Sequence, residues 1–227
     1  MNIGRPRERG EGSRRLAAFR AVQTENRLAY KVITKLTKIW MRFVLRGVAY
    51  RDNHKKLNAI YLVPNPWRLD SPGEQYRFAE TNRLISENFG RVGSLLEIGC
   101  GEGHQSLCLL HVCDRLIGLD VSIRAVERAR KMCPSGQFSV GDIFSKVSDT
   151  KAPFDLVVGC EVLYYMSDVS ASLRRMQVLG RNCLVSYWAG AMRYLDPQVL
   201  SLPGVVSEII RFQNTRWRVA WWPGLQS

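Results

Sequence analysis

The chain has 227 residues, 46% of them hydrophobic, which is enough to bury a sizeable core. Its net charge of +13 is concentrated at one end, because residues 1–56 hold 15 basic and 4 acidic residues against 18 and 16 in the remainder. No uncharged apolar stretch reaches the ~18 residues of a membrane-spanning helix, and the N-terminus lacks the apolar core of a secretory signal. We therefore expect a cytoplasmic protein with a basic arm and a near-neutral domain.

The cysteines and histidines do not indicate a metal site. The six cysteines form no C-x-x-C pair, and the only histidines are His54, His104 and His111. Neither a zinc site nor a disulfide framework is predicted, so we expect reduced and mostly buried thiols.

The N-terminal region divides into three parts. Residues 1–24 are rich in Arg, Gly, Glu and Ser, which predicts a disordered basic tail. From Glu25 to Arg51 apolar residues recur at helical spacing among lysines and arginines, which predicts a basic amphipathic helix. The segment Val63–Gly73 has three prolines and is expected to be a linker or lid. The helix is open to three interpretations: packing on its own domain, binding an anionic membrane surface, or, less favoured, contacting nucleic acid.

From residue 74 to 227 short apolar runs alternate with helical patterns. Helices are predicted at Glu74–Phe89, His104–Val112, Ser122–Met132 and Asp168–Leu179, and strands at Ser94–Ile98, Arg115–Leu119, Gln137–Val140, Phe154–Val158 and Asn182–Tyr187. Two further runs, Val206–Phe212 and Arg216–Trp222, are separated by Gln213-Asn214-Thr215 and predict an antiparallel hairpin. This alternation predicts an α/β fold, a Rossmann-like doubly wound sheet with a C-terminal hairpin and an N-terminal helical extension.

Each predicted strand ends in a glycine turn or a carboxylate. The first ends in the Glu97–Gly103 run, the second at Asp120, the third at Gly141-Asp142, and the fourth leads to Glu161. Ligands of such sheets bind beyond the carboxyl ends of the strands. If the strands lie in the order 3-2-1-4, these groups line one edge across roughly 14 Å, which suits an extended ligand. A carboxylate at the second tip can accept hydrogen bonds from a ribose diol, and Asp142 with Ile143 can hold a purine.

The glycine loop does not fit a phosphate site. No G-x-x-x-x-G-K-[ST] cradle is present, and the spacing G-x-G-x-G differs from the dinucleotide pattern. No Lys or Arg lies between Gly99 and Val112, and no tyrosine is followed four residues later by a lysine. A nicotinamide oxidoreductase is therefore disfavoured.

Four segments in order carry a family resemblance: LLEIGCGEG (Leu95–Gly103), GLD (Gly118–Asp120), GDIF (Gly141–Phe144) and FDLVVGCEVLYY (Phe154–Tyr165). Across about residues 74–190 the chain resembles class I S-adenosylmethionine-dependent methyltransferases, which implies a seven-stranded mixed sheet. The Glu-Val-Leu-Tyr-Tyr element and Asn65-Pro66-Trp67 more narrowly resemble the nodulation-type N-methyltransferases that act on amino sugars.

The resemblance implies a role for each motif. The residues implied for S-adenosylmethionine are Glu97, Gly99, Cys100, Gly101, Gly103, Asp120, Val121, Asp142, Ile143, Glu161 and Leu163. Glu161, Tyr164 and Tyr165 are implied to form the reactive end, where the methyl group meets a small-molecule or glycan-like acceptor. The resemblance implies transfer to nitrogen and implies no metal.

Plainer structural roles stay open for these residues. Asp120 could cap the next helix, the glycines could form an ordinary turn, and either tyrosine could belong to the core. His104 is expected to pack or cap rather than act as a base, and Trp67 to pack rather than cover the ligand. For the whole protein the alternatives are methylation of a lipid-linked, membrane-adjacent or RNA substrate, and a catalytically silent cofactor-binding regulator. The acceptor pocket is expected to take its walls from Val63–Gly73 and Trp188–Gly204.

Overall fold

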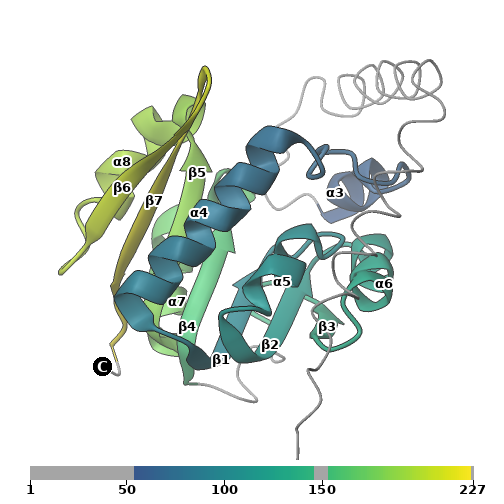
Figure 1. Cartoon of the computed structure of the whole chain (residues 1–227), viewed down its shortest axis with the longest axis horizontal. Coiled ribbons are helices and arrows are strands. Elements are labelled where there is room, and N and C mark those ends of the chain that lie inside the picture. Colours follow the sequence, from purple (N-terminus) through teal and green to yellow (C-terminus); the bar gives the residue numbers. More distant parts are fainter. Residues whose placement is uncertain (1–53, 146–152, 226–227) are drawn as a thin grey trace, which may run out of the picture. The chain divides into compact units, whose positions relative to one another are not determined.

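A computed structural model describes residues 54–145 and 153–225 (Figure 1). The predicted tail at residues 1–24 and the whole of the predicted basic helix at residues 25–51 lie outside the described residues. Within the described ranges no helix is both long and apolar enough to cross a membrane.

The described elements alternate along the chain. The helices are α3 (His54–Ile60), α4 (Pro72–Phe89), α5 (His104–Leu109), α6 (Ile123–Met132), α7 (Val169–Leu179) and α8 (Met192–Val199), with the 3-10 helices η2 (Leu163–Tyr165) and η3 (Ala189–Ala191). The strands are β1 (Val92–Ile98), β2 (Cys113–Asp120), β3 (Gln137–Val140), β4 (Phe154–Cys160), β5 (Gly180–Trp188), β6 (Val206–Phe212) and β7 (Thr215–Pro223).

The strands form one seven-stranded mixed sheet in the order β3-β2-β1-β4-β5-β7-β6. Neighbours from β3 to β5 are parallel, and β7 pairs antiparallel with both β5 and β6. The predicted order 3-2-1-4 is confirmed. This order places the carboxyl ends of β1, β2, β3 and β4 side by side at one edge. The order of the strands along the chain reverses between β1 and β4, which are parallel to each other.

The sheet is covered on both faces. Alternate residues of a strand point to opposite faces, so Leu95 joins the core under α4, α5 and α6, whereas Leu96 joins the core under α7 and α8. Figure 1 shows α4, α5 and α6 crossing one side of the sheet. Because both faces are covered, β1 and β4 are buried along most of their length rather than at alternate residues.

Local signals explain where the helices begin and end. The Ser122 hydroxyl accepts the Ala125 N–H at the start of α6, and Asp168 accepts the Ala171 N–H at the start of α7. Helix α4 begins at Pro72, two residues earlier than predicted. A proline is tolerated in the first turn of a helix because the backbone N–H that it lacks would have no hydrogen-bond partner in the helix. It ends before Gly90, which has a φ of +67°.

Two details of the C-terminal region differ from the sequence prediction. Thr215 pairs with Phe212, so the β6–β7 turn has two residues rather than the predicted three. The segment after β5 contains α8, which the sequence analysis did not identify as a helix because Pro197 interrupts the helical pattern.

Candidate active site

The carboxyl ends of β1 to β4 surround a cavity of about 260 Å³. From the predicted site, the residues that line it are Glu97, Gly99, Cys100, Gly101, Asp120, Val121, Asp142, Ile143, Glu161, Tyr164 and Tyr165. The topology therefore brings together motifs that lie up to 68 residues apart in the chain. Two predicted residues are not part of the lining: Leu163 is fully buried in the core, and Gly103 lies at the N-terminus of α5 beside Cys133.

The glycine loop follows β1 directly and is tightly enclosed. Gly99 has a φ of +73°, and a Cβ there would lie 2.7 Å from Val162 Cγ2. Gly101 has a φ of +54°, and its N–H donates to Asp120 Oδ2 at 2.9 Å. A side chain at Gly99 would be both strained and in collision with its neighbour, so this turn requires glycine there.

Asp120 at the end of β2 is buried and held by backbone groups on both oxygens. Besides the Gly101 contact, the Ser122 N–H donates to Oδ1 at 2.8 Å. Burial raises the pKa of Asp120 to about 6, against the opposing effect of these two hydrogen bonds. Each carboxylate oxygen keeps a further lone pair, so the group can still accept a hydrogen bond from a ligand in the cavity.

Glu97 lies one strand away and is also buried. Its Oε2 accepts a hydrogen bond from the Ser106 hydroxyl at 2.5 Å. Burial raises the pKa of Glu97 to about 7, although the Ser106 contact acts in the opposite direction. A cationic group entering the cavity would favour the ionised form of both Glu97 and Asp120.

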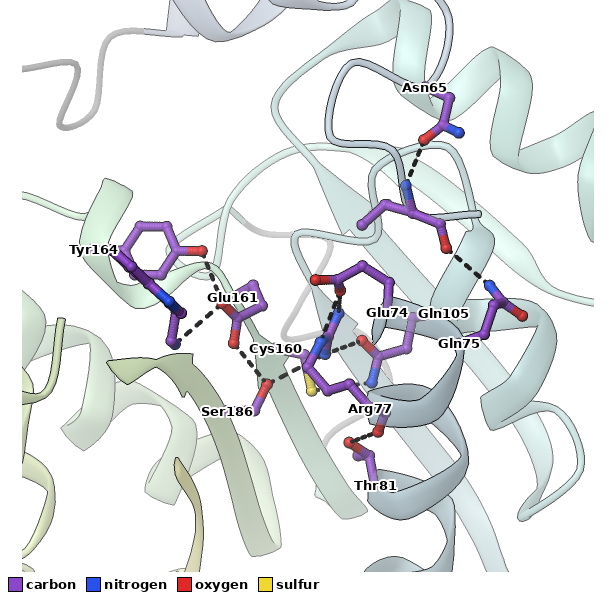
Figure 2. Close-up of polar contacts among 12 residues, drawn as sticks. Asn65, Glu74, Gln75, Arg77, Thr81, Gln105, Cys160, Glu161, Tyr164 and Ser186 are labelled. Atoms are coloured by element: carbon purple, nitrogen blue, oxygen red, sulfur yellow. Dashed lines mark hydrogen bonds and ion pairs between the residues drawn. The ribbon is translucent and has the colours of Figure 1, made fainter. Parts of the chain in front are cut away.

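Arg77 of α4 is a lining residue that the sequence analysis missed. Its guanidinium is 2% exposed and contacts Glu74 through Nε at 2.9 Å and Nη2 at 2.8 Å. Nη1 donates to Gln105 Oε1 at 2.9 Å and to Ser186 Oγ at 3.4 Å (Figure 2). The arginine thus links α4, α5 and β5, a relation that depends on how α4 packs across the sheet and has no local signal in the sequence.

Glu161 follows β4 and has an unusual backbone conformation. Its φ of +56° lies in the left-handed region, which is uncommon for a residue other than glycine. Three groups donate to its carboxylate: Ser186 Oγ to Oε1 at 3.2 Å, and the Tyr164 hydroxyl and the Trp188 N–H to Oε2, each at 3.1 Å (Figure 2). Burial raises the pKa of Glu161, and the nearby Arg77 cation lowers it in part.

Aromatic rings enclose the same end of the cavity. The ring centroids of Tyr164 and Tyr165 are 4.7 Å apart, and those of Tyr165 and Trp67 are 5.6 Å apart. All three residues line the cavity, so Trp67 takes part in the lining rather than only packing elsewhere. The faces of these rings can stabilise a cationic group between them.

Residues 54–70 form a cap over the glycine loop. His54, Leu57, Tyr61 and Leu69 line the cavity together with Trp67. No motif in the sequence points to His54, Leu57 or Tyr61. A Cβ at Gly101 would lie 3.0 Å from the Tyr61 hydroxyl, which shows how closely the cap approaches the loop.

A buried carboxylate holds this cap in place. Glu102 Oε2 accepts the N–H of Asn65 at 2.7 Å and lies 3.7 Å from His104 Nε2, while Oε1 accepts from Arg128 Nη1. Burial alone would raise the pKa of Glu102, but these contacts outweigh it and hold the pKa below its ordinary value. His104 therefore assists the cap and does not line the cavity, as expected for a packing residue.

The segment Trp188–Gly204, which is predicted to wall the acceptor pocket, lies outside the lining of this cavity. None of these residues lines it, because the segment folds into η3 and α8 on the other side of Tyr164.

All six cysteines are free and four are buried. Within residues 54–145 and 153–225 no group of three His, Cys, Asp or Glu side chains is placed to hold a metal ion.

The strand order and the position of the loop define the Rossmann-like fold of the class I methyltransferases. A family model described as Nodulation protein S (NodS) matches residues 49–185, more than half of the chain. The chain belongs to the nodulation protein S family.

Relatives and solved structures agree with this assignment. Nodulation protein S of Bradyrhizobium diazoefficiens is 39% identical over 123 residues, which are 52% of this chain and 57% of that protein. The protein of the same name from Rhizobium tropici is 36% identical over 128 residues, 55% of this chain and 52% of that one. The chain thus spans little more than half the length of these relatives.

Two crystal structures of N-methyltransferase NodS from Bradyrhizobium japonicum WM9 share the fold. One is 25% identical with a TM-score of 0.53 and covers 69% of this chain and 98% of that one. The other, a complex with S-adenosyl-L-homocysteine, is 24% identical with a TM-score of 0.61 and covers 78% of this chain and 100% of that one.

Proposed function

We propose that the protein transfers a methyl group from S-adenosylmethionine to a nitrogen atom of a small-molecule or glycan-like acceptor. The observation that carries the proposal is the charge of the cavity. Its described lining includes five carboxylates, Glu74, Glu97, Asp120, Asp142 and Glu161, and one guanidinium, Arg77. Such a lining suits a cationic ligand without phosphate, and S-adenosylmethionine carries both a sulfonium and an ammonium group.

Different lining residues would bind different parts of S-adenosylmethionine. Asp120 would accept hydrogen bonds from the ribose hydroxyls, and Asp142 with Ile143 would hold the adenine. Glu97 and the Gly99–Gly101 turn would receive the amino-acid end, where the ammonium group meets a buried carboxylate. The related NodS that was crystallised with S-adenosyl-L-homocysteine supports a ligand of this class in the cavity.

At the reactive end the protein has to position an amine and remove a proton. S-adenosylmethionine supplies a methyl group that its sulfonium already activates, so orientation and exclusion of water can account for much of the rate. An amine must be neutral to attack, and Glu161 is suited to accept its proton because burial raises the pKa of this carboxyl. Tyr164 and Ser186 orient the carboxylate through their hydroxyls.

Calorimetry with S-adenosylmethionine and S-adenosyl-L-homocysteine tests the proposal. Asp120→Ala should weaken binding at least tenfold, because a paired buried carboxylate is lost. Glu161→Gln should lower kcat more than it lowers affinity for the cosubstrate. The matched control is Asp114→Ala, because Asp114 is an exposed residue on the same strand and pairs with Arg91. This variant should change neither the affinity for S-adenosylmethionine nor kcat. No binding at millimolar ligand contradicts the proposal.

We propose that the basic N-terminal segment, residues 25–51, attaches the protein to anionic membranes and takes no part in methyl transfer. The charge pattern of residues 25–51 supports this proposal. The full chain should float with vesicles containing phosphatidylglycerol and not with neutral vesicles. Replacing Lys31, Lys35 and Lys38 with Glu should abolish flotation and leave S-adenosylmethionine binding unchanged. No flotation of the full chain with the anionic vesicles contradicts membrane attachment, and equal flotation of both chains contradicts a role for these lysines.

A further inference from the structure

One cation lies in a cavity whose other charged side chains are carboxylates. Arg77 is the only lysine or arginine among the described residues that line the cavity at the ends of β1 to β4, beside five carboxylates. A fixed cation disfavours a cationic ligand through charge repulsion. Since the proposed ligand is cationic, Arg77 has to contribute something that offsets this repulsion, and its contacts indicate what that is.

Three elements fix the Arg77 guanidinium in place. Glu74, three residues earlier on α4, accepts from Nε at 2.9 Å and contacts Nη2 at 2.8 Å. Gln105 of α5 accepts from Nη1 at 2.9 Å, and its own amide donates to Cys160 Sγ at 3.2 Å. Ser186 of β5 also accepts from Nη1. All three nitrogens are therefore engaged, and the side chain is only 2% exposed, so its charge stays at one place in the site.

Ser186 connects this guanidinium with the proposed proton acceptor. Arg77 Nη1 donates to Ser186 Oγ at 3.4 Å, and Ser186 Oγ donates to Glu161 Oε1 at 3.2 Å (Figure 2). A hydroxyl that accepts a hydrogen bond from a cation becomes a stronger donor. The Ser186 carbonyl also accepts the Glu161 N–H at 2.8 Å, which fixes the backbone of the same residue. The chain of contacts from Arg77 therefore favours the ionised form of the Glu161 carboxyl.

The contacts of Glu161 leave one oxygen better able to take a proton. Oε2 accepts from the Tyr164 hydroxyl and from the Trp188 N–H, whereas among the described residues Oε1 accepts from Ser186 alone. A carboxylate oxygen has two lone pairs, so Oε1 keeps one of them. The oxygen that can accept a proton is thus the one that Ser186 joins to Arg77.

Two charges on α4 act on Glu161 in opposite directions. The titratable or charged groups around Glu161 are Arg77 and Glu74 on α4, Cys160 on β4 and Tyr164 on η2. Behind Tyr164 lies a second cavity of about 270 Å³ between α7 and α8, whose lining includes the Asp168 carboxylate. Burial raises the pKa of Glu161, Arg77 lowers it, and Glu74 raises it.

We infer that Arg77 is a positioning residue for Glu161: its cation, acting through Ser186 and moderated by Glu74, keeps the proton acceptor ionised. An ammonium nitrogen of the acceptor then gives a proton to Glu161 Oε1. The neutral nitrogen bonds to the methyl carbon as the bond of that carbon to sulfur breaks, and the electron pair stays on sulfur. This inference rests on the proposed function and adds to it two residues, Arg77 and Glu74, that act without touching the acceptor.

The pH dependence of kcat tests the two charges separately. The probe is glucosamine, with the amine and S-adenosylmethionine both saturating, and the measured quantity is the acid limb, where protonation of Glu161 stops turnover. Arg77→Met should move this limb upward by about one pH unit, because a nearby opposite charge lowers a carboxyl pKa by about 1–3 units. Glu74→Gln should move it downward, because the Arg77 charge is then no longer moderated. The titration of the amine itself is common to all variants and does not contribute to these differences.

Two further variants distinguish charge from packing. Arg77→Lys keeps the cation and should return the limb most of the way to its original position. The matched control is Arg83→Met on the same helix, whose side chain is 39% exposed and pairs with Glu80, and it should leave the limb unmoved. If Arg77→Met does not fold, Glu74→Gln and Arg77→Lys carry the test. Displacement in the same direction in Arg77→Met and Glu74→Gln, or in neither, overturns the inference.

The same variants separate positioning from ligand binding. Calorimetry gives their affinity for S-adenosylmethionine. A large loss of affinity in Arg77→Met with an unmoved acid limb means that Arg77 contacts the ligand directly, and this outcome overturns the inference.

A titration without turnover distinguishes this inference from the proposed function. Infrared difference spectra of the protein against pH follow the carbonyl band of protonated Glu161, which Glu161→Gln identifies by its loss. The midpoint should rise in Arg77→Met and fall in Glu74→Gln. Unmoved midpoints in an enzyme that methylates amines overturn the inference and leave the proposed function in place. No cosubstrate binding and no methylation overturn the proposed function, and the catalytic role of Arg77 with it, even where the midpoints move.

Discussion

Removing the Arg128 guanidinium should loosen the cap over the glycine loop and destabilise the fold. The Glu102 side chain is 4% exposed, and that of Arg128 is 31% exposed. Removing one partner of a fully buried ion pair costs about 3–5 kcal/mol, because the remaining charge is left without compensation. Since Arg128 is partly solvated and Asn65 and His104 still contact Glu102, we expect Arg128→Met to cost about 2 kcal/mol, below that range.

Urea unfolding followed by circular dichroism measures this loss. The control is Arg91→Met, which breaks the exposed pair between Arg91 and Asp114 and should cost less than about 1 kcal/mol. The double variant Glu102→Gln/Arg128→Met removes both charges, so its cost should fall short of the sum of the two single costs by about 1 kcal/mol. Additive costs, or equal losses in Arg128→Met and Arg91→Met, would refute the assigned role of the pair.

The pH dependence of the same comparison has a definite sign. The folded-state pKa of Glu102 lies below its ordinary value of 4.5, so its contacts contribute stability above that pH. The contribution disappears as the pH falls through the folded pKa and the carboxylate is protonated. The difference in unfolding free energy between the original chain and Arg128→Met should therefore shrink in acid, and a difference that grows on acidification contradicts this account.

Three further predictions concern the cavity. Affinity for S-adenosylmethionine should rise between about pH 5.5 and 8, because Glu97 (pKa about 7) and Asp120 (pKa about 6) must ionise to meet a cation; calorimetry giving a flat profile contradicts this. As the pH rises from 5 to 8, Glu97→Gln should become more stable relative to the original chain. The reason is that the original chain must bury an ionised Glu97 above the unfolded-state pKa, which costs stability in the unliganded protein. A urea midpoint of the variant that falls relative to the original chain over this pH range would argue against it. Gly101→Ala should cost about 1–3 kcal/mol from its positive φ and more from contact with the Tyr61 hydroxyl. Adding Tyr61→Phe, which removes that hydroxyl, should relieve the second part of the cost, and urea midpoints that show no relief would contradict the contact.

The motifs at the strand ends could be predicted because each is a local feature. A glycine turn or a carboxylate directly after an apolar run is visible within a few residues, and parallel strands place such turns at one edge. Asp120, Asp142 and the Gly99–Gly103 loop were named on this basis, and the sheet order that joins them is the predicted one. The helix starts at Ser122 and Asp168 were equally local, because a capping side chain reaches only the next turn of its own helix.

Contacts between distant segments could not be predicted in this way. Arg77 occupies an ordinary position in an amphipathic helix, and only the packing of α4 across the sheet brings it to Ser186, 109 residues away. The approach of Tyr61 to the glycine loop and the Glu102 contact with Asn65 likewise depend on where the cap lies.

The sequence by itself determined the fold class, the edge of the sheet at which the cavity lies and the acidic character of its lining. Hydrophobic period and turn chemistry depend on short windows of the chain, so they can be read without coordinates. Only the tertiary structure decided that α8 builds a second cavity behind Tyr164 and that the cap closes through a buried carboxylate. Both result from side chains far apart in sequence, whose meeting is set by topology and packing.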